Sequence, residues 1–472
     1  MKTIFLATAM GCVALAGRLA HAATITWTNT VSGGWNTAAN WNPNQVPGAT
    51  DTAIITNAGV TVTLDISPTV GGIILGTNGA GTVTLSLNSQ TLTLNGPLAV
   101  NPSGSFTVDS GTLAGNSNAV LSGTIGWIAG VLEGILTLAP GSTLNINNSA
   151  NNHTLQGCTF TNNGTVAWAS GTIQGGHGTA IYNYGLWDAQ SDQQLNNNLG
   201  GGTTFNNYGT FLKSAGTEPN STSFQSGVGF VNDGTVDAQN GLMVFSGNFA
   251  NAASTLAVEN GATIQIAQAV VLPGGLVTGS GTVQAPSITS SAVVSPGATN
   301  AVLNLAGNYT QLLGGSIQFD IGGTSPGVNQ SQVNVTGTAN LNGLIALRFS
   351  PGYVPAVNSS NLVLTAASRT GHFPFQDHFY LLGQNKRINA VYSPTNVVLA
   401  TISAADPTNV SLSAAVQGQT FALAWPSEFG SYDLEVKTNL DDLNWTFVPG
   451  VTNFYSETPM TSPHKFFRLE VE

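Results

Sequence analysis

Two aspartates occupy equivalent places in a recurring stretch of this sequence. Asp188 and Asp237 each lie three residues after a glycine, and each precedes an Ala-Gln pair. If these stretches are turns of a β-solenoid two coils apart, about 9.6 Å separates their carboxyl groups, the outer edge of the spacing in inverting glycosidases. Asp192 or Asp233 could join them. Because an outward Asp on a strand is usually just solvated, we interpret the pair as a weak candidate and assign no catalytic residue.

A second pattern, Gly323-Thr-Ser325-Pro-Gly327, matches the G-x-S-x-G text of esterases. In that motif the residue after the serine must donate its backbone N–H to the oxyanion, and Pro326 has no N–H to donate. The sequence around the serine also predicts no helix after it. We therefore reject this serine as a nucleophile.

Two clusters contain residue types that bind metals. His372 and His378 flank Asp377, and the acids at 441–442 stand beside Asn444. Neither spacing fits a strong zinc or calcium motif, so we interpret both clusters as surface residues and predict no metal site. No glycine-rich loop opens a helix anywhere in the chain, so no nucleotide cofactor is expected either.

Charge is scarce, since only 7% of residues are Asp, Glu, Lys or Arg, where a globular domain has about 25%. Between Arg18 and Arg348, Lys213 is the one basic residue. Nucleic acids and anionic membranes require clustered cations, so both are excluded as partners.

The first 22 residues predict an export signal. Lys2 precedes an apolar stretch that ends in Ala20-His-Ala22, a site of the kind that signal peptidase cleaves. Cys12 lacks the Leu three residues earlier that lipoprotein signals carry. Cys158 then remains as the one cysteine of the mature chain, which excludes an internal disulfide. We expect a secreted or cell-surface protein with no integral membrane segment in the mature chain.

The rest of the chain alternates between apolar and polar residues with a period of two, as in Val60, Val62 and Leu64. Gly, Asn, Ser or Pro separate such runs, which predicts an all-β protein of many short strands. The pattern Phe/Ile-x-Asn-x-Gly recurs four times, with its glycines 21, 24 and 25 residues apart, at Gly164, Gly185, Gly209 and Gly234. A repeat of this length indicates one coil of a parallel β-solenoid.

These repeats predict a right-handed parallel β-helix over residues 59–290, with roughly ten coils at one coil per 23 residues. The asparagines of the repeat should stack coil on coil in one column of amide hydrogen bonds, formed by Asn162, Asn183, Asn207 and Asn232. The same residues would also suit plain turns next to glycine.

The flanking segments have different compositions. Residues 23–58 contain Trp27, Trp35 and Trp41, which we expect to cap one end of the rod, although exported tryptophans can also stack on sugars. Residues 291–405 predict a further β segment. Residues 408–472 have an ordinary charge content and suggest a small β-sandwich of about six strands.

The tryptophan-rich opening, the Asn-Gly coils and the stretch from Ser295 through Gly323 to Gly343 resemble bacterial exported proteins with autotransporter-associated beta-strand repeats. The last 64 residues are similar to small C-terminal β-sandwich domains of secreted bacterial proteins. The resemblance implies a parallel β-helix with an adhesin-like or structural role, and it implies no activity.

Three functional hypotheses remain open. The first is a noncatalytic extracellular or cell-surface protein, adhesin-like or structural, with extracellular polysaccharide or surface components as partners. The second is a β-helix polysaccharide hydrolase or lyase that uses Asp188 and Asp237. The third is a noncatalytic carbohydrate-binding protein, suggested by Trp187 and Tyr184, which we expect to point outward.

Overall fold

The computed structural model describes residues 22–115, 118–148, 152–407, 410–442, 444–459 and 464–471. The predicted signal peptide, residues 1–22, lies outside them except for Ala22. The all-β prediction is confirmed: 54% of the residues are in strands, and the helical elements of the described ranges are two 3-10 turns, η1 (Ala38–Asn40) and η2 (Ser427–Phe429). Within these ranges no helix has the length and apolar character that crossing a bilayer requires.

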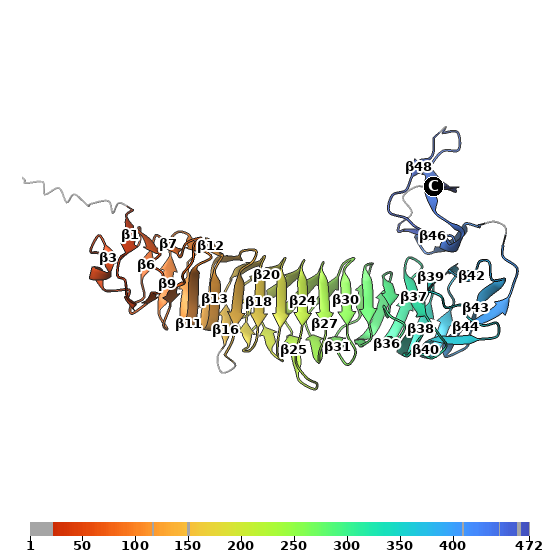
Figure 1. Ribbon diagram of the computed structural model, residues 1–472, viewed down its shortest axis with the longest axis horizontal. Coiled ribbons are helices and arrows are strands. Elements are labelled where there is room, and N and C mark those ends of the chain that lie inside the picture. Colours follow the sequence, from red (N-terminus) through yellow and green to blue (C-terminus); the bar gives the residue numbers. More distant parts are fainter. Residues whose placement is uncertain are drawn as a thin grey trace, which may run out of the picture.

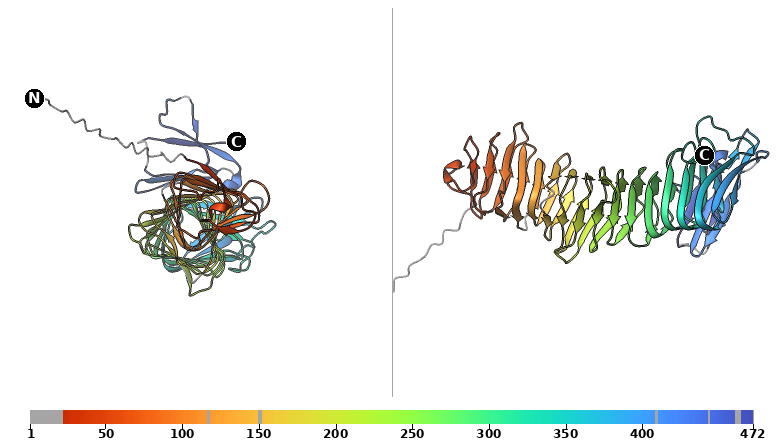
Figure 2. Two further views of the ribbon diagram at one scale, coloured as in Figure 1. Left: turned by 90° about the vertical axis from the view of Figure 1, so that its left-hand side faces the viewer. Right: turned by 90° about the horizontal axis from the view of Figure 1, so that it is seen from below.

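The chain winds into a parallel β-solenoid of about 12 turns, which forms one long rod (Figure 1). Most turns place one strand on each of three faces, which we name A, B and C, and the end-on view shows how the turns superimpose (Figure 2).

Face A is the 12-stranded sheet of β1 (Thr24–Trp27), β3 (Trp41–Asn42), β4 (Thr52–Ile55), β7 (Gly72–Leu75), β10 (Leu98–Val100), β12 (Asn118–Leu121), β14 (Ile135–Leu138), β17 (Thr159–Asn162), β20 (Thr179–Asn183), β23 (Thr203–Asn207), β26 (Val228–Asn232) and β29 (Phe249–Asn251). Face B contains β2 (Gly33–Gly34), β5 (Thr61–Thr63), β8 (Val83–Ser86), β15 (Thr143–Ile146), β18 (Thr165–Trp168), β21 (Leu186–Ala189), β24 (Thr210–Lys213), β27 (Thr235–Ala238), β30 (Thr255–Val258), β33 (Leu276–Gly279), β35 (Val293–Ser295), β37 (Ser316–Ile321), β39 (Leu344–Phe349) and β41 (Phe375–Asp377). Face C contains β6 (Thr69–Val70), β9 (Thr91–Leu94), β16 (His153–Leu155), β19 (Ile173–Gln174), β22 (Gln194–Asn196), β25 (Ser221–Phe224), β28 (Leu242–Phe245) and β31 (Thr263–Ile266).

Longer strands bend across corners of the rod. β11 (Gly104–Ala114) and β13 (Thr124–Leu132) join faces B and C. Toward the C-terminal end, β34 (Thr282–Ser290), β36 (Val302–Gln311), β38 (Gln332–Leu341) and β40 (Ser360–Gly371) run from face C to the strand β32 (Val270–Leu272), which packs beside β29.

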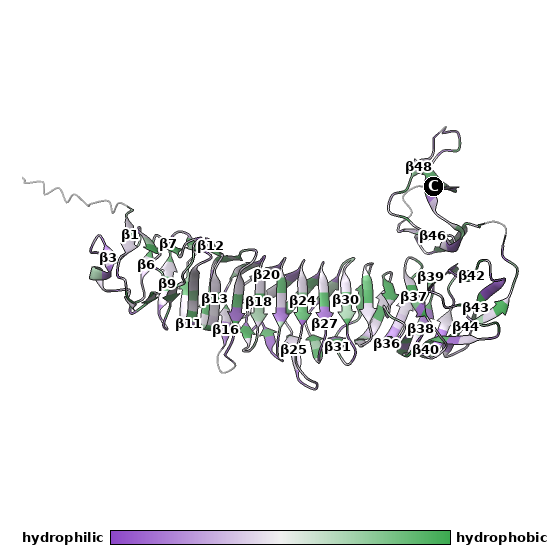
Figure 3. Ribbon diagram, in the orientation of Figure 1, coloured by the Kyte–Doolittle hydropathy of each residue, from purple (hydrophilic) through white to green (hydrophobic). Residues whose placement is uncertain are grey.

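Side chains of alternate residues fill the interior. In β18, Val166 and Trp168 are buried, whereas Thr165 and Ala167 point outward and are partly exposed. This alternation follows from the two-residue period of a strand. Hydrophobic and hydrophilic segments are accordingly mixed along the rod (Figure 3). Side chains therefore fill the interior of the described part of the rod, as the buried cluster that runs from Ile25 to Leu399 indicates.

The predicted asparagine column is confirmed. Asn162, Asn183, Asn207 and Asn232 pair in register on face A, and each is fully buried. The amide nitrogen of each donates to the next side-chain oxygen at 2.7, 2.8 and 2.9 Å, and Asn251 extends the ladder by one more coil.

Parallel pairing extends beyond residues 59–290 at both ends. It begins where β1 pairs with β4, so the segment 23–58 already contains coils, and Trp41 packs edge-on against both Trp27 and Trp35 inside them. Parallel pairing continues through residues 291–377, where β39 pairs with β41. Three antiparallel strands then close the end of the rod on β40: β42 (Tyr380–Leu381), β43 (Lys386–Tyr392) and β44 (Asn396–Ser403).

The C-terminal residues form two antiparallel sheets of three strands each. One contains β45 (Ser413–Gln417), β46 (Thr420–Ala424) and β49 (Phe454–Glu457), and the other contains β47 (Tyr432–Lys437), β48 (Thr446–Phe447) and β50 (Phe466–Val471). Leu423 and Trp425 of the first sheet's segment share a buried cluster with Leu434 of the second. We refer to these two sheets as the C-terminal unit.

Candidate functional site

Asp188 and Asp237 lie where the sequence predicts. Asp188 pairs with Leu212 on the next coil of face B, and Leu212 pairs with Asp237, so the two acids share one outward column two coils apart. Both side chains are partly exposed on strands. The pair therefore stands on an open face with an apolar residue between its members.

Neighbouring side chains already engage both carboxylates. Asp188 accepts hydrogen bonds from Gln190 Nε2 at 2.8 Å and from the Ser214 hydroxyl at 2.5 Å. Asp237 accepts one from Gln239 Nε2 at 2.9 Å. The Ala-Gln pair after each aspartate thus supplies a local partner, and both carboxylates lie on an open strand face.

Asp192 does not join this column. Its Oδ1 lies 2.7 Å from Lys213 Nζ, and its Oδ2 accepts the N–H of Thr217. Lys213 is fully buried and also donates to Thr222 Oγ1 and to the carbonyl of Ala215. A buried ammonium requires such partners, so the one cation of this stretch ties two loops together and is not free to bind a substrate.

The expectation for Trp187 is wrong. It pairs with Val166 and Phe211 at inward positions and is only 1% exposed. Burial of the large indole ring of Trp187 stabilises the core, and the pairing with Val166 places the Trp187 side chain on the inward side of the strand. Tyr184 does point outward, with 53% of its surface exposed, and its ring stacks on that of Tyr208 at 4.8 Å.

An open groove of about 590 Å³ lies farther along the rod, where β33 meets the turn at Pro296. Glu259 is the one ionisable side chain among the residues that line it. A single carboxyl group cannot supply the acid and base that glycoside hydrolysis requires.

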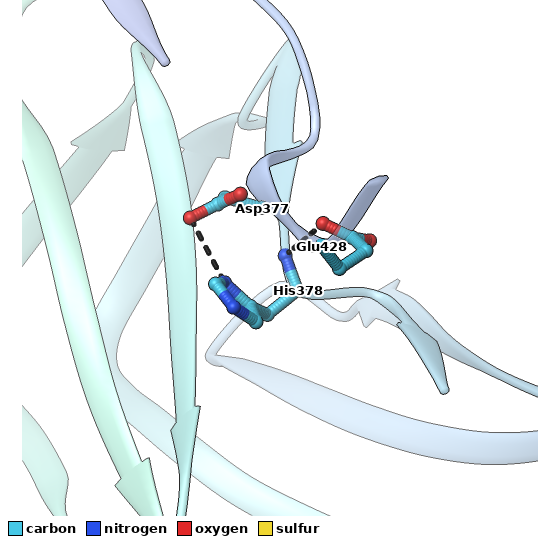
Figure 4. A group of neighbouring side chains, drawn as sticks. All are labelled: Asp377, His378 and Glu428. Carbon is cyan, nitrogen blue, oxygen red and sulfur yellow. Dashed lines mark hydrogen bonds and ion pairs between the residues drawn. The ribbon is translucent and has the colours of Figure 1, made fainter. Parts of the chain in front are cut away.

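A polar cluster forms where the C-terminal unit meets the rod (Figure 4). Asp377 ends β41, His378 follows it with a positive φ of 57°, and Glu428 comes from η2 of the C-terminal unit, 50 residues farther along the chain. His378 Nδ1 lies 3.1 Å from Asp377 Oδ2. The sequence singles out the first two residues but carries no local signal for Glu428.

Backbone groups complete this cluster. Glu428 accepts the N–H of His378 and the N–H of Tyr380, each at 3.0 Å, and Asp377 Oδ1 accepts the N–H of Ser427 at 2.7 Å. Each unit thus supplies a carboxylate that accepts N–H groups from the other unit. We name this arrangement the junction latch, formed by Asp377, His378, Ser427 and Glu428.

The latch perturbs both ionisable partners on the rod. The hydrogen bond that the His378 ring donates to Asp377 raises the pKa of His378 above its usual value of 6.5, with burial opposing the shift and the charges of Asp377 and Glu428 adding to it. Burial alone would raise the pKa of Asp377, but hydrogen bonds from His378 and Ser427 outweigh it and hold that pKa below 3.8. Both shifts favour the ion pair.

Apolar contacts support the same junction. Leu313, Leu344 and Phe375 of the last coils cluster with Ala422 and Ala424 of β46. The carbonyl oxygen of the Gln417 side chain also accepts the N–H of Leu313 at 3.3 Å.

The latch also has the composition of a metal site, because its ligand atoms lie within 4.8 Å of one another. All four carboxylate oxygens, however, already accept hydrogen bonds from Ser427, His378 and Tyr380. A docking contact accounts for every oxygen without an ion. His372 does not join the set, because its ring packs near Tyr392 instead.

The remaining candidates take part in turns. Ser325 lies in a loop, where its N–H donates to the Asn329 side chain. Near the acids at 441–442, Lys437 Nζ donates to the carbonyl oxygens of Leu440 and Asp442 at 2.9 and 3.1 Å, so a cation already occupies that turn.

No protein-family model matches this chain, and a search of curated proteins finds no significant match. The autotransporter-repeat identity suggested by the sequence therefore stays a prediction, while the parallel β-helix is established by the structure. Functional inference rests on the geometry of the chain itself.

Proposed function

We propose that this protein is a noncatalytic extracellular or cell-surface β-helix protein with a structural or adhesin-like role, exported by its first 22 residues. In this proposal the rod is a stiff spacer, and the C-terminal unit is the module held at its end.

The observation that carries the proposal is the continuous stack of about 12 turns with a filled interior. Each coil pairs with the next through backbone hydrogen bonds, so the rod resists bending and holds its ends at a set separation. The junction latch then fixes the C-terminal unit on the last coils. Length and rigidity suit a spacer better than an enzyme, which needs a convergent site.

Export and catalysis can be tested on the same protein. We expect the extracellular or surface fraction to contain a chain that starts at Ala23, as N-terminal sequencing would reveal; a chain found inside the cell with residues 1–22 intact would contradict export.

We also expect neither the wild type nor the Asp188→Asn, Asp237→Asn double variant to cleave a panel of plant and microbial polysaccharides. Turnover by the wild type that disappears in the double variant would favour the hydrolase instead.

Carbohydrate binding is a second candidate, because the stacked rings of Tyr184 and Tyr208 form an exposed aromatic surface. Sugars stack on such rings through their C–H groups. A glycan array should then give signals that the Tyr184→Ala, Tyr208→Ala double variant loses, whereas the outward Tyr182→Ala variant on the same coil should keep them. An array without signals would leave the spacer role alone.

A further inference from the structure

The outward side of face A has no charged residue. Its 12 strands contain no Asp, Glu, Lys, Arg or His, and their outward positions hold Thr, Ile, Val, Ala, Asn, Gly and Tyr. Solvent-exposed sheet faces usually carry charged side chains that keep copies apart. A face of this length without any charge is therefore a property that needs an explanation.

The N-terminal half of face A also exposes an apolar patch. Ile54, Ile74, Ala99 and Val120 follow one another in register on successive coils. Ile74 is 36% exposed, Val120 is 42% exposed, and Ile135 on the adjacent strand is 45% exposed. Contiguous exposed apolar residues of this kind mark interaction surfaces.

The charges of the rod lie elsewhere. Between residues 23 and 300 there is one basic residue, Lys213, against ten acids, namely Asp51, Asp65, Asp109, Glu133, Asp188, Asp192, Glu218, Asp233, Asp237 and Glu259. Of these, Asp51 and Asp233 directly adjoin strands of face A, and Asp51 is buried. With a net charge of −11, two copies repel each other, and a face whose strands carry no charge lets them meet with less repulsion than a charged surface would.

We propose that face A is a self-association surface, on which a second copy of this chain packs its own face A. Twelve strands spaced about 4.8 Å apart span roughly 53 Å, and four residues per strand give a width of about 13 Å. The contact then covers about 700 Å² on each copy, close to the roughly 800 Å² of a stable interface. The absence of charge also matches the charge-depleted centres of such interfaces.

The proposal does not depend on the proposed function, because a self-associating rod could carry any C-terminal module. A second copy fits face A better than a charged partner does, since the face offers neither cations nor carboxylates for an ion pair. A neutral polysaccharide is the other occupant compatible with this chemistry, and the experiment distinguishes it.

The test is sedimentation velocity of the purified protein, produced from the full chain, over a concentration series to about 100 µM. We expect the wild type to form dimers as concentration rises. Val120→Glu should raise the dimer dissociation constant at least about 100-fold, because like charges would meet in a dry contact. Asn118→Glu, at an exposed polar position on the same strand, should act in the same direction if Val120→Glu fails to fold.

Val293→Glu is the matched control, since Val293 is 37% exposed but lies on face B. It should leave the dimer unchanged. A wild type that stays monomeric at every concentration would overturn the proposal. This holds also if the monomer binds a neutral polysaccharide and Val120→Glu abolishes that binding. The proposal would also be overturned if Val293→Glu weakened the dimer as much as Val120→Glu does.

Discussion

The asparagine ladder gives the sharpest test of how the coils are held together. Asn207 lies inside it, fully buried, where Nδ2 donates to Asn232 Oδ1 at 2.9 Å and to the carbonyl of Thr235 at 2.8 Å. Its own Oδ1 accepts from Asn183 Nδ2 at 2.8 Å. We predict that Asn207→Ala is strongly destabilising, because it removes three hydrogen bonds at once.

The magnitude follows from those contacts. Each buried hydrogen bond contributes about 1 kcal/mol net, so three contribute about 3 kcal/mol. The carbonyl of Thr235 and Asn232 Oδ1 would in addition each lose a donor in a dry site, which adds roughly 1 kcal/mol or more. We therefore expect Asn207→Ala to lower the free energy of unfolding by about 3–5 kcal/mol.

The assay is urea unfolding followed by circular dichroism, with Asn206→Ala as the matched control. Asn206 is the neighbouring residue, points outward and donates one hydrogen bond to the carbonyl of Ile181 at 3.1 Å. Its replacement should cost about 1 kcal/mol or less. Equal losses in the two variants, or a loss below about 1 kcal/mol for Asn207→Ala, would refute the view that the ladder stabilises the stack.

Three further predictions concern buried or paired groups. Burial lowers the pKa of His153 below 6.5 despite hydrogen bonds to backbone carbonyls. The unfolded chain therefore binds the proton more readily than the folded chain, so the melting temperature should decline as the pH falls below 6.5. The melting temperature of His153→Gln should decline less over the same pH range. The pKa of His378 is raised and that of Asp377 is lowered, so the latch should be firmest between about pH 3.8 and 6.5, weakening as pH rises through the folded-state pKa of His378 or falls through that of Asp377. Small-angle X-ray scattering should show a larger radius of gyration for the wild type at pH 9 than at pH 6. The radius of gyration of Glu428→Ala should likewise exceed that of the exposed-site control Glu470→Ala, and equal radii would contradict the latch. The thiol of Cys158 is fully buried with a raised pKa, so a thiol reagent should label it only after denaturation, and rapid labelling of the folded protein would contradict its burial.

The sequence by itself determines the character of the rod. The two-residue alternation, the turn glycines and the repeated asparagine predict an all-β parallel stack and the register of Asn162 with Asn183, because these features depend on local periodicity and on one constant repeat length. The same alignment places Asp188 and Asp237 in one column. It also puts Trp187 at the inward position of Val166, a signal that the prediction of an outward Trp187 missed.

The tertiary structure decides what distant segments do to one another. Glu428 meets His378 only because the C-terminal unit folds back onto the last coils, and no spacing or motif in the chain encodes that contact. Lys213 reads as a lone surface cation until the loop that carries Asp192 closes over it. The uncharged face likewise emerges only when 12 short strands, scattered over more than two hundred residues, stack in register and turn the same side outward. Local pattern sets the direction of each side chain, but stacking brings those directions together into a surface or a site.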